Sequence, residues 1–278
     1  TLFAIARWDF DWQDDYRYVE PLELPAGTEL AFEYVFDNSD ANPANPSRPP
    51  QHVRLGDRSI DEMANLTLQV VLPDEAARRG LGEASIRADL RKLGEDAALL
   101  VQLATLLRDG GRFEEGLAAA GRALAVQPTL AAALLERGVC LQRLGRLAEA
   151  ESAYRECLRS EPTSFDARAQ LGAVLLAVSR APEAIAAYEE ALRLRPGAAA
   201  IHANLGAAYL STNDLARAET NFRAALAGDA SLFAAWYYLG EILRATGRSE
   251  EAKQALREAL RLRPGEARAS AALAALGG

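Results

Sequence analysis

The sequence predicts an α+β multidomain chain in which a short strand-rich segment precedes an all-α solenoid. Three observations lead to this class. Pro128, Pro162 and Pro196 recur at a regular spacing in the second half of the chain, and Pro264 falls two steps further on. Segments with the alternation and residue types of strands are confined to positions 1–72. The charge divides in the same way, because residues 1–96 carry 10 basic and 19 acidic side chains whereas residues 97–278 carry 21 and 20.

The strand-rich segment is predicted over residues 1–73. Its candidate strands are Thr1–Arg7, Glu29–Phe36 and Leu66–Leu72, and Gly27 lies in a turn between the first two. The pattern becomes helical after Pro73, so residues 74–96 are expected to form a helical connector to the solenoid.

The proline spacing defines five units of equal length, and we number the places of each unit from its first residue. Place 32 is a proline in four units and Ala230 in the remaining one. Each unit holds two patterns of helical period separated by a turn such as Gly110-Gly111, and the proline ends the second helix. One unit cannot bury its own apolar faces, so successive units are expected to stack into a solenoid with a concave side. The predicted solenoid covers residues 97–275, as units 97–130, 131–164, 165–198, 199–232 and 233–266 and a capping helix 267–275.

Small and bulky residues repeat at fixed places of these units. Places 8, 20 and 27 are glycine, alanine or cysteine, and place 24 is mostly aromatic or leucine. Together with the fragments Trp236-x-x-Leu239-Gly240 and Leu205-Gly206-x-x-Tyr209, these places resemble the tetratricopeptide repeat. The resemblance covers residues 97–266 and implies that the first helices of the units form a groove for a peptide or protein ligand.

The resemblance implies that places 2, 5, 6, 9, 12 and 13 face this groove. Place 2 is mostly alanine, and the polar row at place 6 suits hydrogen bonding to an extended peptide. The alternative is that these positions are only solvated helix faces. His202 is expected to pack rather than to bind a ligand, and no lysine-rich clamp for chaperone tails is present. The candidate groove residues are Gln102, Glu136, Gln170, Asn204, Tyr237, Tyr238, Glu241 and Arg244.

A second resemblance covers positions 1–72. The runs Phe10-Asp11-Trp12-Gln13, Leu24-Pro25-Ala26-Gly27-Thr28 and Gly56-Asp57-Arg58-Ser59-Ile60-Asp61-Glu62-Met63 resemble the end of the C-terminal domain of copper type II, ascorbate-dependent monooxygenases. The resemblance implies that residues 1–73 are part of an antiparallel β-sandwich. It also implies that Met63 is a copper ligand, because a soft thioether suits Cu(I).

The implied copper site is incomplete in this chain. The family completes it with a His-x-His pair, but the only histidines here are His52 and His202. The other ligands are therefore expected upstream, in a parent protein that carries the copper. This chain alone is expected to bind no copper tightly and to lack catalytic activity. Without the resemblance, Met63 would be an ordinary core methionine.

Composition argues against two further classes of partner. The formal net charge is −8 without a basic stripe, so nucleic-acid binding is not expected. No apolar run approaches the roughly 20 residues that span a bilayer, so no membrane span is expected. Cys140 and Cys157 cannot form a framework of disulfides, and we expect two buried thiols, with a single bridge as the alternative.

Two functions remain as hypotheses. The first is a protein–protein interaction scaffold that binds a peptide or protein in the repeat groove, attached to the truncated end of a copper monooxygenase domain. The second is a fragment of a bacterial copper- and ascorbate-dependent monooxygenase, a hydroxylating oxidoreductase whose other ligands lie upstream. A third possibility is a spacer with an inert groove. The copper resemblance implies an extracytoplasmic or periplasmic location, and a cytoplasmic one stays open.

Overall fold

The computed structural model describes residues 75–277, which form twelve α-helices and contain no β-strand. These helices belong to one unit, Asp74–Gly278. None of them combines the length and the apolar character that crossing a bilayer requires. In chain order the helices are α1 Glu75–Leu93, α2 Ala97–Asp109, α3 Phe113–Val126, α4 Ala131–Arg143, α5 Leu147–Ser160, α6 Phe165–Ala177, α7 Ala181–Leu194, α8 Ala199–Ser211, α9 Leu215–Gly228, α10 Phe233–Ala245, α11 Ser249–Leu262 and α12 Ala267–Ala274.

The predicted α+β class is corrected to all-α for this part of the chain. Residues 75–277 hold helices and turns only, because their apolar residues recur at helical spacing and bury one stripe of each helix. The partial β-sandwich predicted over residues 1–73 lies outside the described residues, and so does Met63.

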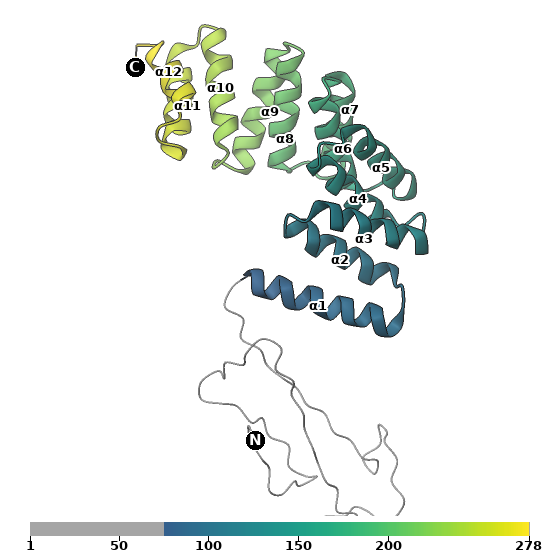
Figure 1. The fold of residues 1–278 in the computed structure, drawn as a ribbon. Coiled ribbons are helices and arrows are strands. Elements are labelled where there is room, and N and C mark those ends of the chain that lie inside the picture. Colours follow the sequence, from purple (N-terminus) through teal and green to yellow (C-terminus); the bar gives the residue numbers. More distant parts are fainter. Residues whose placement is uncertain (1–74, 278) are drawn as a thin grey trace, which may run out of the picture. The chain divides into compact units, whose positions relative to one another are not determined.

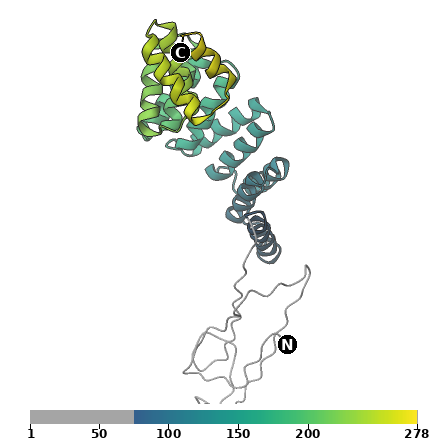
Figure 2. The ribbon, with the colours of Figure 1, turned by 90° about the vertical axis from the view of Figure 1, so that its left-hand side faces the viewer.

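The helices stack as pairs in chain order. The two helices of each pair, beginning with α2 and α3, pack against each other, and each second helix also contacts the first helix of the following pair. Figures 1 and 2 show this succession from two directions. Helix α1 packs on α2 through the buried side chains Ile86 and Leu90, and α12 packs on α11 at the other end with Ala269 buried. Both terminal pairs are thus covered on their outer faces.

Glycines at place 8 allow the two helices of a pair to approach closely. Gly138 lies against the ring of Tyr154, and Gly172 lies against the ring of Tyr188. A Cβ atom added at Gly172 would lie 2.7 Å from a carbon of the Tyr188 ring, which is closer than real Cβ contacts. Both tyrosines are fully buried. The small residues are therefore required by the packing, as the residue pattern predicted.

The turn inside each pair needs one residue with positive φ at place 15. Gly111, Gly145 and Gly247 supply it with φ between 76° and 78°. Ser179 and Asn213 occupy the same place in the other two pairs, with φ of 62° and 59°. Asparagine tolerates this left-handed region better than most residues, whereas serine adopts it at a cost.

Successive pairs are also joined by a hydrogen bond from place 4 to the backbone of the preceding unit. Trp236 Nε1 donates to the carbonyl of Ala230 at 2.9 Å. His202 Nε2 lies 2.9 Å from the carbonyl of Pro196, which can only accept, so this nitrogen carries the proton. Arg168 donates to the carbonyl of Pro162 in the same way. Three different side chains thus satisfy a loop carbonyl at equivalent joints.

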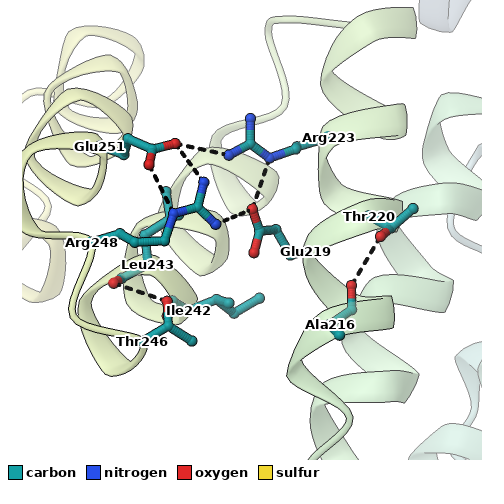
Figure 3. Close-up of polar contacts among 9 residues, drawn as sticks. All are labelled: Ala216, Glu219, Thr220, Arg223, Ile242, Leu243, Thr246, Arg248 and Glu251. Carbon is teal, nitrogen blue, oxygen red and sulfur yellow. Dashed lines mark hydrogen bonds and ion pairs between the residues drawn. The ribbon is translucent and has the colours of Figure 1, made fainter.

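A network of four charged residues joins every second helix pair to the helices that precede it. At the joint between α9 and α11, Arg248 contacts Glu219 at 2.7 Å and Glu251 at 2.6 Å, and Arg223 contacts the same two carboxylates at 3.0 and 3.1 Å (Figure 3). We call this arrangement the inter-pair network. It recurs between α1 and α3 and between α5 and α7, formed there by Glu83, Arg87, Arg112 and Glu115 and by Glu151, Arg155, Arg180 and Glu183.

Candidate functional site

The first helices of the pairs line the inner side of the array. Helix α2 contacts α4 directly, α4 contacts α6, and α6 contacts α8. The second helices make no contact of similar extent with one another in the described part of the chain. Elements that lie closer together are on the inside of a curved stack, so the inner side runs along α2, α4, α6 and α8. We take α10, the first helix of the last pair, as the C-terminal continuation of this groove.

A pocket of about 500 Å³ opens at the N-terminal end of this groove. It spans three successive pairs, because α2, α4 and α6 each supply side chains, and the start of α3 closes one side. Its walls are partly apolar and partly charged. The lining residues are Arg108, Asp109, Gly111, Phe113, Val139, Arg143 and Gln170.

A buried ion pair supports this pocket. Arg108 Nη1 lies 2.7 and 2.8 Å from the two carboxylate oxygens of Glu136, which is only 7% exposed. The same guanidinium also contacts Asp109 at 2.9 Å through Nη2. Burial raises the pKa of Glu136 above its ordinary value, and the nearby Arg108 charge partly opposes this rise in pKa. The donors of Arg108 are therefore largely occupied within the protein.

Arg143 differs from Arg108 in its surroundings. Its guanidinium carbon lies 4.7 Å above the centre of the Phe113 ring, a cation–π contact between α4 and the start of α3. Among the described residues it has no carboxylate within ion-pair distance, and its side chain is exposed. A positive charge thus faces the pocket while an aromatic ring fixes its position.

The middle of the groove is small and apolar. Its places 5 and 9 in the third and fourth units are Ala169, Ala173, Ala203 and Ala207, all half-buried. Leu176 and its equivalent in α8 occupy place 12 and pack against the main core. This surface of small side chains allows a polypeptide backbone to lie close to the helices but offers it few hydrogen-bond partners.

The C-terminal end of the groove is aromatic. The rings of Tyr237 and Tyr238 are 5.2 Å apart, and Tyr238 also stacks on the buried Phe222 at 5.7 Å. Tyr238 is nevertheless 38% exposed. Glu241 and Arg244 lie further along α10 and pair at 3.0 Å. This end therefore presents an anchored aromatic surface beside a neutralised ion pair.

Comparison with known protein families agrees with this geometry. A family model described as tetratricopeptide repeat matches residues 101–165 and 204–267, and one described as TPR repeat matches residues 180–213. The chain carries tetratricopeptide repeats. Both matches lie within the stacked pairs, so the repeat resemblance found in the sequence is confirmed. No curated protein matches the chain.

Several solved structures share the fold at low sequence identity. YrrB, described as a TPR protein with an unusual peptide-binding site, is 22% identical with a TM-score of 0.59, over 68% of this chain and 98% of YrrB. MamA from Desulfovibrio magneticus RS-1 is 21% identical with a TM-score of 0.57, over 63% of this chain and 98% of MamA. PilF of Pseudomonas aeruginosa is 19% identical with a TM-score of 0.58, over 72% and 90%.

The tetratricopeptide array places the predicted groove residues in three different surroundings. Gln170 lines the N-terminal pocket, and Glu136 is buried beneath it in the pair with Arg108. Gln102 and Asn204 are exposed on α2 and α8. The four residues predicted on α10 lie together at the aromatic end, namely Tyr237, Tyr238, Glu241 and Arg244.

The remaining predicted residues act elsewhere. His202 is half-buried and packs at a joint of the array, with Nδ1 3.0 Å from Asn221 Oδ1. Both cysteines are buried free thiols, as predicted, and burial raises the pKa of Cys140 to about 11. No group of three or more histidine, cysteine, aspartate or glutamate side chains among residues 75–277 is arranged to hold a metal ion. The copper position Met63 lies outside the described residues.

Sequence reasoning found Gln170 but missed the other residues that line the N-terminal pocket. Arg108 and Arg143 occupy places 12 and 13, and Val139 occupies place 9, all of which the repeat resemblance puts on the groove. A tabulation of these places would therefore have found them. Phe113 begins a second helix, and only the folded turn brings its ring beneath Arg143.

Proposed function

We propose that this protein is an interaction module that binds an extended peptide segment of a partner protein in the groove along α2, α4, α6, α8 and α10. The observation that carries the proposal is the N-terminal pocket, because its walls come from three successive repeats and it opens on the groove. A ligand that fills it would contact several repeats at once, which only the stacked array makes possible.

Two other features support the same function. The small alanine side chains in the middle of the groove allow the backbone of a bound peptide to lie close to the helices. At the far end, Tyr238 exposes part of its ring although Phe222 and Tyr237 hold it in place. Rigid, partly exposed aromatic side chains are frequent energetic centres of protein interfaces. The tetratricopeptide protein YrrB is itself described as having a peptide-binding site.

Selection of peptides from a displayed random library against the full chain tests this function. We expect selected peptides to lose affinity about tenfold or more for Tyr238→Ala, because truncating an aromatic anchor costs about 1–2 kcal/mol. Val126→Ala is the matched control, since Val126 is a similarly exposed apolar residue at the end of the second helix α3. A library that yields no binder, or binders weakened by Val126→Ala and not by Tyr238→Ala, would contradict the proposal.

The copper hypothesis rests on positions 1–72 alone and stays a prediction. Reading the coding sequence upstream of Thr1 tests it, because an intact site requires a His-x-His pair there. The extracytoplasmic location depends on the same resemblance. It would be tested by locating a tagged copy of the whole parent protein in cell fractions.

A further inference from the structure

The groove contains three arginines at ligand-facing places, and they differ in how their charge is compensated. Arg108 is paired with Glu136 and Asp109, and Arg244 is paired with Glu241. Arg143 has no such carboxylate among residues 75–277. Among the groove arginines in the described part of the chain, Arg143 is thus the one whose hydrogen-bond donors are available to a ligand.

The position of Arg143 is set before any ligand arrives. The guanidinium carbon lies 4.7 Å from the centre of the Phe113 ring, and this cation–π contact holds the charged end of the side chain over the ring. This contact uses none of the guanidinium N–H groups in a hydrogen bond to oxygen, so these donors stay available to a ligand. Because the side chain is already held, binding through it costs little additional conformational entropy.

The walls around Arg143 define which chemical group fits. The Phe113 ring and Val139 offer an apolar surface, and the Gln170 amide adds a polar group that can donate a hydrogen bond. The acidic residue that lines the pocket, Asp109, contacts Arg108 at 2.9 Å and shares this guanidinium with Glu136. A short apolar stem ending in a carboxylate matches this combination, since arginine binds carboxylates with two parallel hydrogen bonds.

We infer that the N-terminal pocket is a subsite for an acidic residue of the bound peptide, with its carboxylate on Arg143 and its methylene groups against Val139 and Phe113. The inference rests on the proposed peptide-binding function and specifies its ligand. A side-chain carboxylate and a C-terminal carboxylate share this chemistry, and the experiment below separates them. At the opposite, aromatic end of the groove, the groove arginine Arg244 is paired with Glu241.

The first arm of the test uses a small probe and needs no known partner. N-acetylglutamic acid α-amide is titrated into the full chain while the side-chain N–H signals of Arg143 and Gln170 are followed by NMR. We expect both signals to shift to saturation, and no saturating shift with N-acetylglutamine amide. Arg143→Gln should abolish the response of Gln170, and Arg143→Lys should weaken it, because lysine keeps the charge but not the planar donor pair. Equal responses to the two probes would overturn the inference.

The second arm uses arrays of C-terminally amidated peptides with one internal glutamate, the same peptides with glutamine, and glutamine peptides with a free C-terminus. We expect peptides with a carboxylate to bind about tenfold more tightly than the glutamine peptides, because they gain one charge-assisted hydrogen-bonded pair. This preference should be lost in Arg143→Gln. Preference for the internal glutamate identifies a side-chain ligand, and preference for the free terminus identifies a C-terminal one. Peptide binding without any such preference overturns the inference and leaves the proposed function standing. Binding of the small probe with no peptide bound supports the subsite and contradicts the proposed function.

Discussion

Arg248 Nη1 lies 2.7 Å from Glu219 Oε1, across the joint between two successive helix pairs. The equivalent contacts Arg180–Glu151 and Arg112–Glu83 have lengths of 2.8 and 2.6 Å. The glutamates Glu83, Glu151 and Glu219 recur at every second repeat. The array therefore has a second, doubled period in its joints, superposed on the single-repeat period of its packing.

At the intervening joints the inter-pair network is missing because its residue types change. Leu117 and Ile185 occupy the place of the joint glutamate, and Asp214 replaces the arginine in one of the two cases. The first of these joints instead carries the buried pair of Arg108 with Glu136, on the groove side. In the second joint, Tyr209 donates a hydrogen bond to Glu189 at 2.6 Å. These joints are thus all tied by polar contacts: the network recurs at alternate joints, and a different contact is present at each of the two intervening ones.

A double-mutant cycle should reveal the coupling between Arg248 and Glu219. We expect Arg248→Ala and Glu219→Ala to show a coupling free energy of about 0.5–1 kcal/mol, at the upper end of exposed pairs because four charges act together. At about 1 M salt the coupling should largely disappear, because the Debye length falls to about 3 Å. The free energy of unfolding in urea at low and high salt gives both values.

Arg146→Ala provides the control for this cycle, since Arg146 pairs only with Glu149 in the described residues and the place of the joint glutamate is held by Leu117. Its effect on stability should be smaller than that of Arg248→Ala. A coupling of zero at low salt would show that the network does not stabilise the joint.

The contact between Gly172 and Tyr188 predicts a penalty for any side chain at the glycine. Gly172→Ala should lower the free energy of unfolding by about 1–3 kcal/mol, because the new methyl group overlaps a fully buried ring. Gly121→Ala is the matched control, since Gly121 is also inside a helix but has open space at its Cβ. This control should raise stability by about 0.5–1 kcal/mol through helix propensity. Chemical denaturation of both variants measures these changes in the free energy of unfolding. Equal changes for the two variants would refute the steric argument.

The positive φ of Ser179 predicts that glycine is the better residue in this turn. Ser179→Gly should raise the free energy of unfolding by about 0.5–1 kcal/mol, because the relieved strain exceeds the added freedom of the unfolded chain. The reverse change at the equivalent place, Gly145→Ser, should destabilise by a similar amount. Thermal and urea unfolding measure both. If Gly145→Ser is neutral, backbone strain at this place is not significant.

The buried Glu136 predicts a defined pH dependence. Burial raises its pKa above the ordinary value of 4.5, so the folded state binds a proton more readily than the unfolded chain. Its favourable contribution is then fully present below pH 4.5 and is lost as pH rises through the folded-state pKa. The stability of the wild type relative to Glu136→Gln should therefore fall as pH rises from about 4 through the folded-state pKa, in urea titrations at each pH. A difference that rises over this range would mean that Arg108 outweighs burial.

Much of the helical part could be predicted from the sequence, because its regularity is local. Small residues at place 8, turn residues at place 15 and apolar residues at helical spacing are visible in one unit and repeated in the next. The predicted α+β class is wrong for the part of the chain that the structure describes, because residues 75–277 are all helical and the strand-like segments that led to this class lie at positions 1–72. The sequence predicted Glu136 as a groove-facing residue like the other residues at place 6. In the structure Glu136 is buried, because it pairs with Arg108 from the preceding repeat.

The sequence by itself determined that this chain forms stacked helix pairs, since amphipathic helices in a regular repeat bury their apolar stripes only against neighbouring pairs. Only the tertiary structure decided which charges are compensated and which face the groove. Arg108 and Arg143 occupy adjacent groove places in neighbouring units, yet one is neutralised by a buried carboxylate and the other rests on an aromatic ring. Charge compensation depends on short distances between side chains far apart in the chain, and stacking fixes those distances.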